Sequence, residues 1–261
     1  LTMTSDNDES GAGSSTLTSA PLSANGGTIT LNSNGQSITQ SGSIGGDETI
    51  NSSNGAVSIG VLDGDAAGTR SLTVNAGTAT FTTTGAIGAT NKLNNLTVSA
   101  DDVALGANVA GGGTLTLQPT STSRNVSINN GGSSNFNIDS TEISHLVDGW
   151  AGIKIGSISG TGNYYIGLTS WTDPVQFIHG AGIILNGNIV GSGNASIAFN
   201  NSGGYVAINN GRSISTSNQS VSFASTLASY GGTISTSGGL LSLVNLTLAD
   251  YFSASTSGGN I

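Results

Sequence analysis

The sequence predicts an all-β fold, a right-handed parallel β-solenoid of about a dozen coils, because apolar residues alternate, turn residues recur and the pattern repeats. Apolar side chains stand at every second position in short bursts such as Leu72 and Val74, as in strands with one buried face. Gly, Asn, Asp and Ser fill the intervals and suit tight turns. Long amphipathic helical patterns are nearly absent, so an antiparallel sandwich is the main competing fold.

Internal repeats favour the solenoid over the sandwich. The segment SLTVNAGTATF aligns with NLTVSADDVAL, which places Leu72 over Leu96 and Phe81 over Leu105. The segment GTLTL then places Leu115 over Leu96. Coils of about 20 residues whose loops differ in length explain a period that varies along the chain.

We expect one solenoid over residues 1–261, with regular coils at 1–138 and 183–261. Residues 139–182 form an irregular, aromatic-bearing insertion between these coils. Such an insertion is the expected lateral feature of the solenoid.

A short helical turn is predicted near residues 139–147, at the start of the insertion. Asp139 is a candidate N-cap, and Glu142 follows three residues later as in a capping box. Ile143, Leu146 and Val147 continue at helical spacing.

Composition excludes several classes of function. The formal net charge is −9, and the 5 basic residues are scattered, so we expect no nucleic-acid partner. No apolar run approaches the ~20 residues that cross a bilayer, so we expect no membrane insertion. The absence of Cys removes disulfide and thiolate chemistry. The first residues lack the layout of a signal peptide, so we expect the chain to be soluble or its export signal to lie outside this sequence.

Three blocks of the sequence resemble the repeat regions of filamentous haemagglutinin-like proteins, which are large exported adhesins of Gram-negative bacteria. The blocks are LTMTSDNDESGAGSSTL, SLTVNAGTATFTTTGAIGATNKLNNLTVSADDVALGANV, and DSTEISHLVDGWAGIKIGSISGTGNYYIG through DPVQF. Together they cover more than half of the chain. The resemblance implies a right-handed parallel β-helix at the bacterial cell surface, with a role in adhesion, biofilm or sheath structure. The chain departs from that family in showing no N-terminal secretion module, which leaves its export route open.

The two ends of the sequence predict an assembly interface. The final GGNI followed by the initial LTMT gives a near copy of the internal strand GGTITL, as though one coil had been cut in two. We therefore expect end-to-end stacking through open coil edges, with copies of the chain or adjacent repeats of a longer chain as partners. The residues expected at this interface are Leu1, Met3, Leu17, Leu248 and Ile261.

The aromatic residues of the insertion provide an alternative function, the binding of a glycan or a host surface. Trp150, Tyr164, Tyr165 and Trp171 would bind sugar rings if their faces were exposed in a row. The competing interpretation is that these rings fill the interior or cover the helical turn.

We expect no enzymatic activity, although polysaccharide lyases and hydrolases also use parallel β-helices. Such enzymes need carboxylates that converge on one cleft. The candidate pairs are Asp101 with Asp102, Asp63 with Asp65, and Asp47 with Glu48. Adjacent strand residues point to opposite faces, so we interpret these groups as turn carboxylates.

No cofactor is expected, and calcium is the one weak candidate. Clustered carboxylates on turns are hard oxygen ligands, but neither cluster has the spacing of a calcium loop. The weak calcium candidates are Asp6, Asp8, Glu9, Asp63 and Asp65.

Threonines raise ice binding as a further hypothesis. Ice binding requires flat ranks of Thr over many coils, whereas Thr78, Thr80 and residues 82–84 occupy one neighbourhood. The sequence therefore does not favour it.

Overall fold

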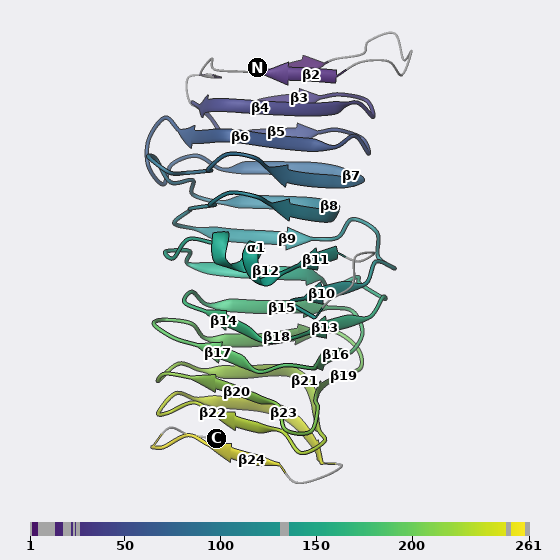
Figure 1. Ribbon diagram of the computed structural model, residues 1–261, viewed down its shortest axis with the longest axis vertical. Coiled ribbons are helices and arrows are strands. Elements are labelled where there is room, and N and C mark those ends of the chain that lie inside the picture. The colour runs from purple at the N-terminus through teal and green to yellow at the C-terminus, as the bar shows by residue number, and fades with distance from the viewer. Residues whose placement is uncertain are drawn as a thin grey trace. The chain divides into compact units, whose positions relative to one another are not determined.

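The computed structural model describes residues 2–4, 14–17, 22, 24, 27–130, 136–248 and 252–258. They form an all-β parallel β-solenoid of about 10 turns with one short helix (Figure 1). The predicted fold class is therefore confirmed.

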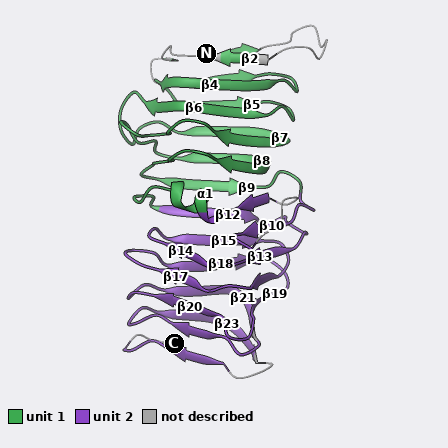
Figure 2. Cartoon of the chain, viewed as in Figure 1, with its two compact units in different colours: residues 1–121, 141–151 green, residues 122–140, 152–261 purple. Residues whose placement is uncertain are grey.

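The chain divides into two compact units (Figure 2). Unit 1 comprises residues 1–121 and 141–151, and unit 2 comprises residues 122–140 and 152–261. The division passes through the segment 139–182 that the sequence marks as irregular.

Unit 1 is built from short strands that pair side by side in two parallel ladders. Its described strands are β1 (Thr2–Thr4), β2 (Ser14–Leu17), β3 (Ile29–Asn32), β4 (Ser37–Ile44), β5 (Glu48–Asn51), β6 (Val57–Gly64), β7 (Leu72–Thr83), β8 (Leu96–Leu105) and β9 (Thr114–Gln118). One ladder runs β1, β3, β5, β7, β8, β9. The other runs β2, β4, β6 and then the second halves of β7 and β8.

Parallel in-register pairing stacks equivalent residues of unit 1 into columns. Leu72 lies beside Leu96, and Leu96 lies beside Leu115, which confirms that part of the predicted alignment. All three side chains are fully buried. Burial of such side chains contributes roughly 1.5–3 kcal/mol each, which makes these columns the main source of stability.

The predicted position of Phe81 over Leu105 is wrong, because Phe81 lies beside Val103. The register shifts on either side of Gly77, where β7 bulges away from β8. Gly77 has φ +62°, and the following Thr78 N–H donates to the Asn54 side-chain oxygen at 2.9 Å. A bulge changes the count of residues between the two halves of a strand, so alignment by sequence offset fails beyond it.

Unit 2 has three parallel ladders. Its described strands are β10 (Val126–Ile128), β11 (Phe136–Ile138), β12 (Gly152–Ser157), β13 (Tyr164–Ile166), β14 (Thr169–Trp171), β15 (Val175–His179), β16 (Ile183–Leu185), β17 (Ile189–Gly191), β18 (Ile197–Asn201), β19 (Tyr205–Ile208), β20 (Ser213–Thr216), β21 (Val221–Ser229), β22 (Thr233–Ser235), β23 (Leu241–Leu248) and β24 (Ser253–Ser255). The first ladder runs β12, β15, β18, β21, β23. The second runs β11, β10, β13, β16, β19, β21, β23. The third runs β14, β17, β20, β22, β24.

Buried hydroxyls shape several corners of the coils. The side chains of Ser52, Thr216 and Thr236 are buried, and each donates a hydrogen bond to the carbonyl three residues later. Asn54 and Asn218 follow in these turns with positive φ, which Asn tolerates better than most residues. The Ser, Thr and Asn content therefore serves turn formation as well as solubility.

The predicted helical turn is present as α1 (Ser140–His145). Two of its side chains bind one residue of β8. Glu142 Oε1 accepts the Leu105 N–H at 2.9 Å, and His145 Nδ1 lies 2.6 Å from the Leu105 carbonyl oxygen. These side chains bind the backbone groups at the end of β8 in the way that another strand would.

Candidate functional sites

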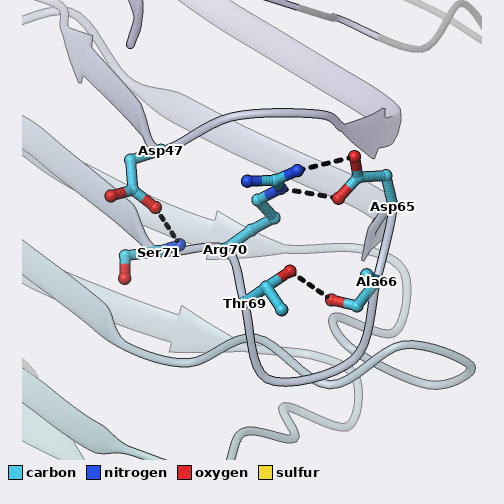
Figure 3. Close-up of polar contacts among 6 residues, drawn as sticks. All are labelled: Asp47, Asp65, Ala66, Thr69, Arg70 and Ser71. Carbon is cyan, nitrogen blue, oxygen red and sulfur yellow. Dashed lines mark hydrogen bonds and ion pairs between the residues drawn. The ribbon is translucent and has the colours of Figure 1, made fainter. Parts of the chain in front are cut away.

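The calcium candidates within the described residues have protein partners for their carboxylates. Asp63 Oδ1 accepts the N–H groups of Thr90 at 2.9 Å and Asn91 at 3.2 Å. Asp65 forms a bidentate ion pair with Arg70, at 2.6 and 2.8 Å (Figure 3). The hydrogen bond from Arg70 lowers the pKa of Asp65.

The described residues contain no cluster of three or more His, Cys, Asp or Glu side chains that could hold a metal ion. The other calcium candidates, Asp6, Asp8 and Glu9, lie outside the described residues.

The members of the remaining carboxylate pairs make different local contacts. Asp101 accepts the Ser121 N–H at 2.7 Å, whereas Asp102 accepts the N–H of Val103 at 3.0 Å. Asp47 is exposed and accepts the Ser71 N–H at 2.9 Å (Figure 3), while its neighbour Glu48 is buried. Each pair is thus divided between separate local contacts.

Three of the four aromatic residues considered for glycan contact are interior residues. Trp150, Tyr164 and Trp171 are 1%, 0% and 3% exposed. Tyr164 donates its hydroxyl to the Ile155 carbonyl at 3.0 Å, and Trp171 donates its indole N–H to Thr169 at 3.1 Å. Of the two interpretations that the sequence left open, burial supports the interior one for these three rings, because a sugar cannot stack on rings that the coils cover. Tyr165 is half-buried on β13.

The predicted assembly residues are at the edges of ladders where the structure describes them. Met3 lies in β1, which among the described residues pairs with β3, and its side chain is 38% exposed. The backbone of Leu17 in β2 lies beside Gln40, and the backbone of Leu248 in β23 lies beside Ser229. Leu1 and Ile261 lie outside the described residues.

The edge strand β23 exposes apolar side chains that sequence analysis did not single out. Val244 is 62% exposed and Leu246 is 42% exposed, and Leu240 just before the strand is 51% exposed. Leu246 follows Val206 and Leu227 in one column, and both of those side chains are fully buried. The apolar residues in SLVNLTL indicate a strand, but the pattern does not show whether that strand lies inside a ladder or at its edge.

A rank of threonines on the outer face of unit 1 was also missed. Register aligns one Thr from each of five successive strands of a ladder: Thr30, Thr49, Thr73, Thr97 and Thr116. The residues two positions on form a second rank, in which Asn75 donates to Asn51 at 2.7 Å and Asn51 donates to Asn32 at 3.0 Å. The signal is the recurring four-residue pattern ITLN, ETIN, LTVN, LTVS and LTLQ, which variable loops separate in the sequence.

Comparison of the chain with protein-family models, curated proteins and solved structures finds no match. The fold is therefore established by the structure alone, and the adhesin-like resemblance supports a proposal rather than an assignment. None of the described helices has the length and apolar character needed to span a membrane.

Proposed function

We propose that this chain is a structural segment of an extracellular fibre at a bacterial cell surface, lengthened by coils that stack on its open edges. The observation that carries the proposal is the exposure of Leu246, because its column partners Val206 and Leu227 are fully buried. A further coil placed on β23 would bury Leu246 as the inner coils bury those partners.

The backbone of β23 supports the same proposal. Within the described residues, β23 pairs with β21 and with no other strand. An open ladder edge presents unpaired N–H and C=O groups, which another strand can satisfy. Backbone pairing would set the register, and burial of apolar side chains would add affinity.

The edge strand β1 of unit 1 has the complementary features. Met3 is in register with Leu31 and Ile50, which are buried, and is itself 38% exposed. Stacking of one copy's β1 edge on another copy's β23 edge would be a heterologous contact. A heterologous contact that does not close into a ring lengthens a fibre.

The resemblance to filamentous haemagglutinin-like repeats supports the surface location. In proteins of that kind, coils follow one another along one long chain, so the next coil comes either from a second copy or from an adjacent repeat. We propose the second copy as the partner of the isolated chain, since its edges carry the required strands.

A matched pair of substitutions tests the stacking of copies. Leu246→Lys places a charge in the edge column, whereas Val61→Lys changes an apolar residue of β6 that is 57% exposed. We expect the wild type and Val61→Lys to form concentration-dependent oligomers in analytical ultracentrifugation and filaments in cryo-electron microscopy. Leu246→Lys should remain monomeric with unchanged circular dichroism.

The outcomes separate the two sources of the next coil. A wild-type chain that stays monomeric at high concentration contradicts the stacking of copies. Denaturation of native surface fibres then tests covalent continuation, which would release chains far larger than this one.

The threonine rank favours a second candidate function, binding to ice. Adjacent strands lie about 4.8 Å apart and alternate residues about 6.6 Å apart, so the Thr and Asn ranks form a periodic grid of polar groups. Hydrogen bonds within the Asn rank hold that grid in place. A rigid periodic face suits a periodic partner, and such a rank is the feature that the sequence alone did not reveal.

The ice-binding candidate is tested by inhibition of ice recrystallisation. A double variant, Thr73→Lys with Thr97→Lys, disrupts the centre of the rank. Thr39→Lys in β4 is the control, since Thr39 is exposed on the other ladder of unit 1. Inhibition that the double variant loses and the control keeps supports the candidate, and absence of inhibition by the wild type excludes it.

A further inference from the structure

Glu48 occupies an apolar column of unit 1. It lies between Ile29 and Leu72 in the β3, β5, β7 ladder, and its side chain is 1% exposed. Both neighbours in the column are fully buried aliphatic residues. A carboxylate in such a position loses its hydration without gaining a cation, which is costly.

The side chain that contacts Glu48 is a second buried polar residue, Gln40 of β4. Gln40 is also 1% exposed, and its Nε2 donates to Glu48 Oε2 at 2.8 Å. The other oxygen of each side chain, Gln40 Oε1 and Glu48 Oε1, is buried and has no hydrogen-bond partner. If Glu48 is ionised, both of these oxygens are acceptors and neither can satisfy the other.

One proton on Glu48 removes this conflict. A protonated Oε1 becomes a donor, and Gln40 Oε1 is the unsatisfied acceptor on the partner side chain. The amide would donate to the acid and the acid would donate to the amide, so the pair would close through two hydrogen bonds. A protonated acid also avoids the cost of a buried charge.

Among the described residues, the strands around Glu48 supply no cation that would favour the ionised form. Strands β2, β3, β4 and β7 carry no ionisable side chain, and β6 carries Asp63, which binds the backbone of Thr90 and Asn91. Asp47 precedes Glu48 at an exposed turn, and Arg70 pairs with Asp65 at another. Burial raises the pKa of the Glu48 carboxyl from 4.5 to about 7, and the hydrogen bond from Gln40 opposes this rise.

We propose that Glu48 and Gln40 form a neutral acid–amide pair that stabilises the N-terminal coils of unit 1, and that loss of its proton to solvent weakens these coils as pH rises. The structure thereby contains a pH-sensitive element that acts through fold stability. Because β3 lies between β5 and the edge strand β1, the element is one strand removed from the proposed assembly edge.

The sign of the effect follows from linkage. A group whose pKa is raised by folding contributes stability that is fully present below its unfolded pKa, near 4.5, and is lost as pH rises through about 7. Across that window the folding equilibrium constant should fall by on the order of 100-fold. This contribution of Glu48 is therefore larger at pH 5.5 than at pH 8.5, whereas His179, whose pKa is lowered by burial, contributes in the opposite direction over the same range.

Glu48→Gln is the decisive variant, because an amide at this position reproduces the hydrogen bonds of the neutral acid and cannot ionise. Urea denaturation of the full chain at pH 5.5 and 8.5 should show that raising the pH lowers the midpoint of the wild type relative to the midpoint of Glu48→Gln. Asp47→Asn, which alters the exposed neighbour, should keep the pH dependence of the wild type. A variant Glu48→Gln that retains the full pH dependence would overturn the proposal.

A second measurement decides the matter even if Glu48→Gln does not fold. Carbon-13 labelling of glutamate side chains gives three carboxyl signals, for Glu9, Glu48 and Glu142. We expect one of them to titrate well above the ordinary range of a glutamate. If all three titrate near the ordinary glutamate pKa, Glu48 is ionised at neutral pH and the proposal fails.

Discussion

Both units are built from parallel ladders, but the buried columns of the two units hold different types of side chain. In unit 1, the column Leu31, Ile50, Val74, Val98, Leu117 is aliphatic throughout. In unit 2, the column through β15, β18 and β21 is aromatic, with Phe177, Phe199 and Phe223 in register. The centroids of Phe199 and Phe223 lie 4.9 Å apart with nearly parallel rings, and those of Phe177 and Phe199 lie 5.5 Å apart.

This difference shows how an in-register ladder handles side chains. Adjacent strands lie about 4.8 Å apart, so any residue type that recurs at one position is stacked on its own kind. Aliphatic, Phe, Thr and Asn columns all arise in this way. A single dissimilar residue, such as Glu48, receives no suitable neighbour from the strands on either side. It must instead find a partner across the coil, and Gln40 is that partner.

The largest expected effect comes from breaking the aromatic column. Phe199→Ala should destabilise the chain by about 3–5 kcal/mol through the cavity it leaves, and it also removes two ring contacts of roughly 0.5–1.5 kcal/mol each. Leu96→Ala in the aliphatic column of unit 1 should cost about 2–5 kcal/mol. Chemical denaturation of both variants compares the units. An equal or smaller cost for Phe199→Ala would show that ring stacking adds nothing beyond burial.

A smaller loss of stability is expected from a substitution beside Trp150, a buried aromatic residue of unit 1. A Cβ on Gly111 would lie 2.1 Å from two atoms of the buried Trp150 ring, so Gly111→Ala should cost roughly 1–3 kcal/mol by overpacking.

The neighbouring glycine provides the control for this prediction. A Cβ on Gly112 meets nothing within 4 Å, so Gly112→Ala should leave the midpoint unchanged or raise it slightly. Equal midpoint shifts for the two variants in thermal denaturation would contradict the assignment of Trp150 as a tightly packed interior residue.

Much of the fold was predictable because alternation and turn residues report the strand period directly. The pairs Leu72 with Leu96 and Leu96 with Leu115 followed from alignment alone. The position of Phe81 did not, because β7 bulges at Gly77, where the Thr78 N–H donates to Asn54 of the previous coil. A contact of this kind has no local signature in the sequence.

The candidate sites were less predictable, since they depend on which face a residue occupies. The rings of Tyr164 and Trp171 lie in short strands whose buried positions alternate. Because the loops around these strands vary in length, the sequence does not show which of the alternating positions face the interior. Glu48 was visible in principle, because ETIN places Glu where ITLN and LTVN place an aliphatic residue. Recognising this required the coil register, which variable loop lengths obscure.

The Asn rank on the outer face of unit 1 should contribute less to the free energy of unfolding than the buried columns of either unit. Asn75→Ala removes the hydrogen bond to Asn51 in a half-buried ladder, and we expect a cost of about 1 kcal/mol. Asn194→Ala, at an exposed turn of unit 2, is the control and should be close to neutral. Denaturation midpoints in urea measure both, and a neutral Asn75→Ala would mean that water replaces the ladder without loss.

The smallest effect on stability should come from the exposed ion pair of Arg70 with Asp65, which contrasts with the buried pair of Gln40 with Glu48. Arg70→Ala should leave the thermal midpoint unchanged, because water and salt screen charges at the surface. The pKa of Asp65 should nevertheless rise toward its ordinary value, since the hydrogen bond from Arg70 is what lowers it. Carboxyl titration by NMR measures this rise, while the Glu48 signal should not move. A rise at both carboxyls would mean that charge at the turn reaches the interior, whereas a rise at Asp65 alone shows that surface and core carboxylates of one unit are set independently, by a cation outside and by burial inside.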